Sequence, residues 1–126
     1  MIFGIGTDIV DVRRFEKWLQ NEELLERYFN EAELFSKGSK SSLCQHYAVR
    51  FAAKEAFSKA LGTGICFDLR EVFVKKNADG KPELYFSEKL KKLLEEKCGE
   101  CRIFVSLSHE KEYAVANVVI EKTEKF

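Results

Sequence analysis

Alternating apolar and polar residues predict strands at both ends of the chain. A β-prone run that contains glycines predicts a strand at about residues 2–9. Residues 102–108 and 112–122 alternate with the period of two that a sheet with one buried face requires. We therefore expect these two segments to form a C-terminal hairpin.

Helical patterns occupy most of the first half of the chain. Residues 12–36 are helical but broken, and Asn30 is a good N-cap with Glu33 at the capping-box position. The longest helix is predicted at about 42–61, where Gly62 would end it in the left-handed conformation. An exposed loop, SKGSKSS, precedes this helix.

A second hairpin and a further helix lie between these regions. The strand-like runs 69–77 and 81–87 flank a turn in which Asp79 and Gly80 are expected to supply the positive φ of a tight hairpin. Ser87 then opens a helix with leucines at helical spacing. The order of elements predicts an α+β fold, with a mostly antiparallel sheet packed around one long helix.

Length and composition limit the possible function classes. The chain has 126 residues, which suits a single domain over residues 1–126. It carries 21 basic and 21 acidic side chains, so no bulk field attracts nucleic acid or an anionic membrane. The N-terminus lacks a signal-peptide pattern, and no run approaches the roughly 18 apolar residues of a membrane span. We expect a cytoplasmic protein whose four cysteines are reduced.

The segment RFAAKEAFSK, residues 50–59, places charged groups among small ones. At about 100° per residue, Ala48, Ala52, Glu55 and Lys59 share one narrow helix face. An ordinary i, i+4 ion pair would explain Glu55 and Lys59 without any function. Alanines around these two groups instead leave room for another object, which is either a sheet or a ligand.

Asp8, at the end of the first strand, is the first candidate partner for Glu55. It could simply cap or turn the chain. If the two carboxylates meet in space, they form a hard-oxygen site suited to Mg²⁺, which commonly takes one or two carboxylates together with water and substrate phosphate.

Two further segments have the chemistry of anion-binding sites. Lys81 follows Gly80, and a backbone turn with a neighbouring ammonium can receive a phosphate, although the hairpin alone needs no ligand. His109 follows two serines between two strands, and it is either structural or part of a nucleotide site.

The cysteines allow a zinc alternative. Cys98 and Cys101, with Cys44 and His46, would formally make a zinc set, although scattered small hydrophobic residues with coincidental spacing are the preferred explanation. The glycines fit neither a Walker loop nor a Rossmann fingerprint, because the required spacing is missing.

Four motifs together resemble one family from end to end. They are GIGTDIVDVRR at 4–14, RFAAKEAFSKALGTGI at 50–65, DGKP at 79–82 and SLSHEKEYAVANVVIE at 106–121. Their order and spacing are similar to the holo-acyl-carrier-protein synthases, the small bacterial class of 4′-phosphopantetheinyl transferases. The resemblance implies that fold and a Mg²⁺-dependent transfer of 4′-phosphopantetheine from coenzyme A to a serine of apo-acyl carrier protein, releasing 3′,5′-ADP, for fatty acid biosynthesis.

The resemblance also implies a role for each matching residue. Asp8 and Glu55 would bind the metal and, with Lys59, would be the catalytic residues. The residues implied for coenzyme A are Arg50, Lys59, Gly62, Gly80, Lys81, Pro82, Ser106 and His109. Arg13 and Arg14 would meet the acidic carrier. Asp79 replaces an asparagine that is common in this motif, so the details of nucleotide contact could differ.

Members of this class resemble homotrimers with active sites between subunits, and the same assembly is implied here. The acceptor of the serine proton stays open between a water on the metal and one of the two carboxylates, of which Glu55 is preferred. The rival from another class is a non-catalytic coenzyme A or nucleotide-binding module, which would bind the ligand without modifying a carrier.

Overall fold

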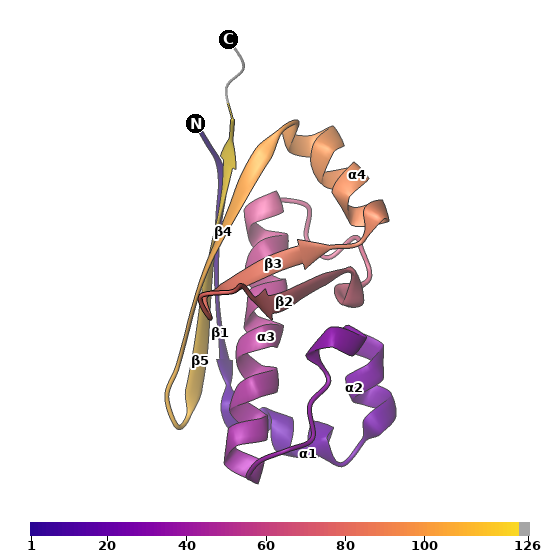
Figure 1. Ribbon diagram of the computed structural model, residues 1–126, viewed down its shortest axis with the longest axis vertical. Helices are drawn as coiled ribbons and strands as arrows, with labels where there is room; N and C mark the ends of the chain where they lie inside the picture. Colours follow the sequence, from indigo (N-terminus) through magenta and orange to yellow (C-terminus); the bar gives the residue numbers. More distant parts are fainter. Residues whose placement is uncertain (124–126) are drawn as a thin grey trace.

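The computed structural model describes residues 1–123, which form two antiparallel sheets and several helices around one long helix (Figure 1). The larger sheet has the strand order β1 (Ile2–Asp11), β5 (Tyr113–Lys122), β4 (Cys101–His109). The smaller sheet pairs β2 (Val72–Lys76) with β3 (Pro82–Phe86). The predicted α+β class is confirmed, and the strands form two hydrogen-bonded sheets instead of one.

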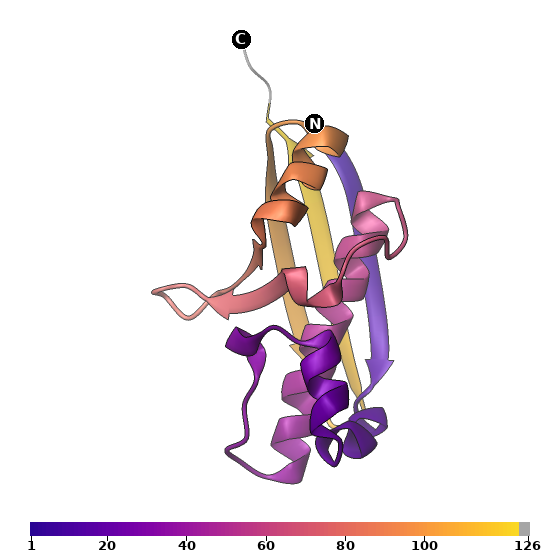
Figure 2. The same ribbon diagram turned by 90° about the vertical axis from the view of Figure 1, so that its right-hand side faces the viewer.

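Helix α3 (Lys40–Leu61) lies along one face of the three-stranded sheet, as Figure 1 and Figure 2 both show. Its start is two residues earlier than predicted, because the Ser39 side chain accepts a hydrogen bond from the Ser42 backbone N–H and caps it there. Gly62 ends the helix in the left-handed conformation with φ of 82°, which confirms its predicted place.

Small residues let β1 and α3 approach each other very closely. A Cβ added to Gly6 would lie 2.7 Å from the Ala60 backbone nitrogen and would overlap the Ala56 carbonyl oxygen. Ala48 and Ala52 are fully buried. The alanines of α3 therefore make room for the sheet, which is one of the two alternatives that the sequence leaves open.

The N-terminal half contains the broken helical region that the sequence predicts. Its elements are η1 (Val12–Phe15), α1 (Glu16–Leu19), α2 (Glu22–Tyr28) and η2 (Glu31–Glu33). The Asn30 side chain caps η2, and the Glu33 carboxylate accepts the Asn30 backbone N–H at 3.0 Å, which confirms the predicted capping box.

The smaller sheet follows a 3-10 turn, η3 (Leu69–Glu71), and leads into α4 (Glu88–Cys98), which Ser87 caps as predicted. Gly80 has φ of 83°, whereas Asp79 does not adopt a positive φ. The Asn77 side chain instead organises the turn by accepting the Asp79 and Lys81 backbone N–H groups.

The three-stranded sheet has two different faces. Residues that face α3, such as Val118 and Ile120, are fully buried. The face away from α3, called the outer face below, carries exposed apolar side chains: Ile5 (66%), Ile9 (61%), Phe104 (47%) and Tyr113 (43%). Within residues 1–123, no helix is long and apolar enough to cross a membrane.

Candidate functional site

The structure brings Asp8, Glu55 and Lys59 together where β1 crosses α3. Lys59 Nζ donates to Asp8 Oδ1 and to the Thr7 carbonyl oxygen, both at 3.0 Å. Within residues 1–123, the ion pair of Lys59 is therefore with Asp8 and not with Glu55. The simple i, i+4 explanation does not account for this geometry.

Glu55 shares the electrostatic environment of this cluster. Partial burial raises the pKa of the Glu55 carboxyl above its ordinary value, and the nearby negative charge of Asp8 raises it further. Lys59 and Arg14 act in the opposite direction on the same pKa. The side chain of Asp8 is 15% exposed and that of Lys59 is 54% exposed, so the cluster opens to solvent through the lysine.

Arg14 lies on the same side of α3 as Glu55, over an aromatic surface. Its guanidinium is 5.1 Å from the centroid of the Phe51 ring and 5.8 Å from that of Trp18. Such stacking fixes the orientation of an arginine while leaving it charged. Arg14, Trp18, Phe51 and Glu55 all line one cavity of about 510 Å³.

Arg13 differs from Arg14, because it is committed to a local ion pair. Its guanidinium Nη2 lies 2.8 Å from Asp11 Oδ2, and both side chains are well exposed. The Asp11 carboxylate raises the pKa of Arg13, so the guanidinium stays charged. The two arginines form a basic edge, in which Asp11 neutralises the charge of Arg13 but not that of Arg14.

Three of the predicted nucleotide-site residues line a second cavity of about 400 Å³. They are Arg50 on α3, Pro82 on β3 and His109 at the end of β4. Arg50 Nη1 donates to the His46 carbonyl oxygen at 3.1 Å, but its Nε is buried and has no partner among the described residues. A buried donor without an acceptor is costly, so a ligand oxygen here would be favourable.

The other predicted nucleotide-site residues are more scattered. Gly62 follows the end of α3, one turn beyond Lys59. Gly80 and Lys81 lie at the tip of the β2–β3 hairpin, and Lys81 lines a separate cavity of about 340 Å³ with Phe104. Ser106 lies opposite Asn117 on the outer face of the sheet.

Two groups of side chains thus emerge on different sides of one helix. Arg50 and Glu55 are five residues apart on α3, which places them about 140° apart around its axis. The two cavities that they line share no residue. Within one chain the predicted site is therefore divided into two halves.

Several lining residues were missed from the sequence. His46 and Lys76 line the cavity of Arg50, and Trp18 and Phe51 line that of Glu55. Burial lowers the pKa of His46 to about 4, so its ring is neutral near pH 7. Phe51 could have been predicted as a site residue, because it follows Arg50 directly in the motif. No feature of the sequence marked Lys76 as a site residue.

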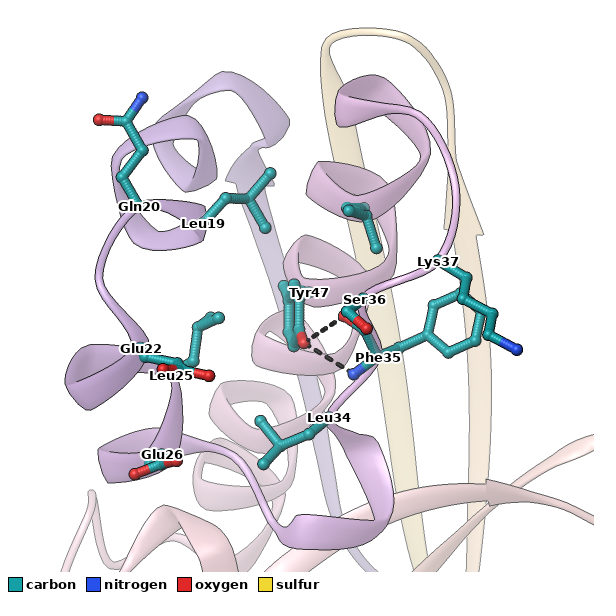
Figure 3. Close-up of a pocket in the computed structure, with 11 residues that line it drawn as sticks. Leu19, Gln20, Glu22, Leu25, Glu26, Leu34, Phe35, Ser36, Lys37 and Tyr47 are labelled. Carbon is teal, nitrogen blue, oxygen red and sulfur yellow. Dashed lines mark hydrogen bonds between the residues drawn. The ribbon is translucent and has the colours of Figure 1, made fainter.

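A further cavity of about 700 Å³ contains none of the predicted site residues. It lies between α2 and the segment that precedes α3, and Figure 3 shows Tyr47 at its base. The Tyr47 hydroxyl accepts from the Phe35 N–H at 2.9 Å and donates to the Phe35 carbonyl oxygen at 2.8 Å. These bonds fix the loop in front of α3.

The alternative zinc set is not assembled. Cys44 and His46 lie in the first turns of α3, whereas Cys98 ends α4 and Cys101 begins β4. No three His, Cys, Asp or Glu side chains among residues 1–123 are grouped as metal ligands. The zinc hypothesis therefore lacks the geometry that it needs.

Comparisons with known proteins agree along almost the whole chain. The family model of the 4′-phosphopantetheinyl transferase superfamily matches residues 4–118. A holo-[acyl-carrier-protein] synthase of Treponema denticola is 46% identical over 123 residues, which cover 96% of this chain and 99% of that protein. One of Geobacter sulfurreducens is 46% identical over 126 residues, covering 97% of this chain and 99% of that protein.

Solved structures give the same result. The crystal structure of a holo-(acyl-carrier-protein) synthase from Bacillus anthracis in complex with CoA (3′,5′-ADP) superposes with a TM-score of 0.78 at 40% identity, covering 98% of this chain and 99% of that one. The synthase from Neisseria meningitidis gives a TM-score of 0.83 at 37% identity, with coverages of 97% and 100%. The chain belongs to the holo-[acyl-carrier-protein] synthase family of the 4′-phosphopantetheinyl transferase superfamily.

Proposed function

We propose that this protein transfers 4′-phosphopantetheine from coenzyme A to a serine of apo-acyl carrier protein at the Asp8, Glu55 and Lys59 cluster, in the cytoplasm and for fatty acid biosynthesis. The observation that carries the proposal is the approach of Asp8 on β1 to Glu55 and Lys59 on α3. Two carboxylates and an ammonium at one solvent-open place suit a pyrophosphate with its cation. Family membership supports the same reaction.

The two carboxylates fit a magnesium ion. Asp8 and Glu55 are close enough for the charge of one to raise the pKa of the other, so a cation between them would relieve their repulsion. Mg²⁺ is commonly held by one or two carboxylates and leaves its other positions to water and phosphate. When bound, it would supply charge neutralisation for the pyrophosphate of coenzyme A.

The chain's own groups then have separate tasks. The serine oxygen forms a bond to the β-phosphorus of coenzyme A, the phosphoanhydride bond breaks, and 3′,5′-ADP leaves with the bridging oxygen. The Lys59 ammonium offsets the charge of the transferred and leaving phosphates. Glu55 is our candidate acceptor of the serine proton, because its raised pKa makes it more basic than an ordinary glutamate.

The nucleotide part of coenzyme A is assigned to the cavity of Arg50, Pro82 and His109. Arg50 Nε is buried and has no partner within residues 1–123, which supports this assignment because an anionic ligand would satisfy it. Gly62, Gly80, Lys81 and Ser106 would complete the contacts, with some of them supplied by another subunit. The division of the site into two halves on one chain favours this arrangement.

A homotrimer with active sites between subunits is part of the proposal. The outer face offers four exposed apolar side chains from three strands, and such a surface favours association. An interface there would place Ser106 and Phe104 against a second chain. One subunit would then supply the Asp8 half of the site, and its neighbour would supply the Arg50 half.

Carrier docking is assigned to the basic edge of Arg13 and Arg14. Acyl carrier proteins are acidic, so a fixed guanidinium beside Glu55 would steer the carrier towards the catalytic cluster. Arg14 is the better anchor of the two, because stacking on Phe51 orients it while the charge of Arg13 is matched by Asp11. Arg27 lines the same cavity and would extend the docking surface, whereas the charge of Arg70 is matched by Asp68 at 2.6 Å.

The test is mass spectrometry of apo-carrier incubated with the protein, coenzyme A and Mg²⁺. The carrier serine should gain the mass of one phosphopantetheine group, and the gain should stop reversibly when EDTA removes the metal. Binding of coenzyme A without any modified carrier would instead establish the non-catalytic module. Undiminished transfer in excess EDTA would contradict the metal assignment.

A further inference from the structure

A buried ion pair lies between the two halves of the site. The side chains of Lys54 and Glu33 are both 0% exposed, and Lys54 Nζ lies 2.6 Å from Glu33 Oε1. Charged groups are rarely buried so completely, because removing them from water costs more than one ion pair returns. Nothing in the proposed chemistry uses either residue, so the pair requires a different explanation.

Every donor of the lysine is used. Besides Glu33, Lys54 Nζ donates to the Leu69 carbonyl oxygen at 2.9 Å and to the Val72 carbonyl oxygen at 2.6 Å. These two oxygens lie at the start of η3 and at the start of β2. The lysine therefore ties α3 to the segment that enters the smaller sheet.

The glutamate makes a matching set of contacts. Its Oε1 also accepts the Asn30 backbone N–H, and its Oε2 accepts the Val74 backbone N–H, each at 3.0 Å. The Glu33 carbonyl oxygen lies 2.6 Å from His46 Nε2, which donates to it because a carbonyl only accepts. One carboxylate thus connects η2, β2 and α3.

The segments joined in this way form walls of both cavities. Leu69 lines the cavity that contains Glu55, and Val74 lines the cavity that contains Arg50. Lys54 immediately precedes Glu55 and lies one turn after Arg50 on α3. A shift of β2 or η3 relative to α3 would therefore move walls of the metal half and of the nucleotide half together.

We infer that Glu33 and Lys54 are positioning residues for the transferase, and that they hold η3 and β2 in register with α3 so that both halves of the site keep their shape. The inference rests on the proposed assignment of Glu55 and Arg50. Neither residue of the pair touches the substrate. In some proteins, buried polar networks of this kind specify one arrangement of the elements around them, even where apolar residues would be equally stable.

The experiment compares Glu33→Gln, Lys54→Met and the double variant with Leu90→Ala. Leu90 is a buried core residue on α4 and lines neither cavity. Its truncation therefore serves as a control that destabilises the protein, as the pair variants do, without changing a cavity wall. Each protein is first shown by circular dichroism to be folded at a low assay temperature. Steady-state transfer then gives kcat and the KM for coenzyme A, and calorimetry gives its Kd without the carrier.

Each single variant of the pair should lower kcat/KM for coenzyme A at least tenfold, since displacements near 1 Å can cost about 100-fold. The Kd for coenzyme A should rise as well. The double variant should lose no more activity than the losses of the two single variants combined, because the two residues act as one unit. Leu90→Ala should stay within about twofold of the parent.

Two results would overturn the inference. If the pair variants match Leu90→Ala in kcat and Kd whenever all are folded, the pair has only a structural role. If either single variant alone leaves transfer unchanged, the two residues do not act together. Glu55→Gln and Arg50→Ala are measured in parallel, so that full activity in those two variants would show that the site assignment itself has failed.

Discussion

The close packing of β1 on α3 makes Gly6→Ala a direct test of how the proposed catalytic cluster of Asp8, Glu55 and Lys59 is assembled. The added Cβ would lie 2.7 Å from the Ala60 nitrogen and would overlap the Ala56 carbonyl oxygen, whereas ordinary contacts begin at 3.4 Å. Both atoms belong to the backbone of α3, so β1 would have to move outward by about 1 Å or more. Asp8 lies only two residues further along the same strand.

The expected consequences are a loss of stability and a larger loss of activity. Overpacking of this kind costs about 1–3 kcal/mol in unfolding free energy. A shift of about 1 Å would also lengthen the 3.0 Å contact between Lys59 and Asp8, and kcat should fall about 100-fold. Urea denaturation and the transfer assay measure the two effects separately.

Leu94→Ala provides the control, because this buried residue of α4 lies away from the cluster and its truncation costs about 2–5 kcal/mol. It should lose stability but keep its kcat at temperatures where it is folded. A Gly6→Ala protein with the stability and the kcat of the parent would refute the reasoning, because the strand would then have had room to spare.

Four further changes have defined outcomes. Glu55→Gln should lower transfer by at least about 100-fold by removing a metal ligand and proton acceptor, and full activity with Mg²⁺ would contradict both roles. Arg14→Ala should raise the carrier KM about tenfold and weaken its salt dependence while coenzyme A binding stays intact; an unchanged carrier KM would defeat the docking assignment. Phe104→Glu should convert the proposed trimer to monomers in analytical ultracentrifugation and abolish transfer, whereas an active monomer would show that one chain suffices. For His46, whose pKa burial lowers from 6.5 to about 4, the unfolded chain binds the proton first as the pH falls, so stability is lost below about pH 6.5. Between pH 7 and 5 the parent should lose about 1 kcal/mol more unfolding free energy than His46→Gln, a value reduced for the partial exposure of the ring, and equal losses would refute the buried neutral state.

Local sequence signals predicted most of the elements correctly, because their causes lie within a few residues. The capping box of Asn30 and Glu33 and the terminal Gly62 of α3 act through neighbouring backbone groups. The two-residue alternation of β4 and β5 is likewise a local property. The prediction for the turn of the β2–β3 hairpin was only partly right, because the Asn77 side chain organises this turn.

The sequence by itself determined the fold class, the family and the identity of the candidate catalytic residues, since motif order and residue type are properties of the chain. The tertiary structure alone decided which groups meet. It paired Lys59 with Asp8, 51 residues away, and it buried the alanines of α3 against β1. It also placed Lys54, the neighbour of Glu55 in the motif, in an ion pair with Glu33. Such contacts depend on the distance between strands and helices, which no local pattern specifies, and so the division of the site into two halves became visible only in three dimensions.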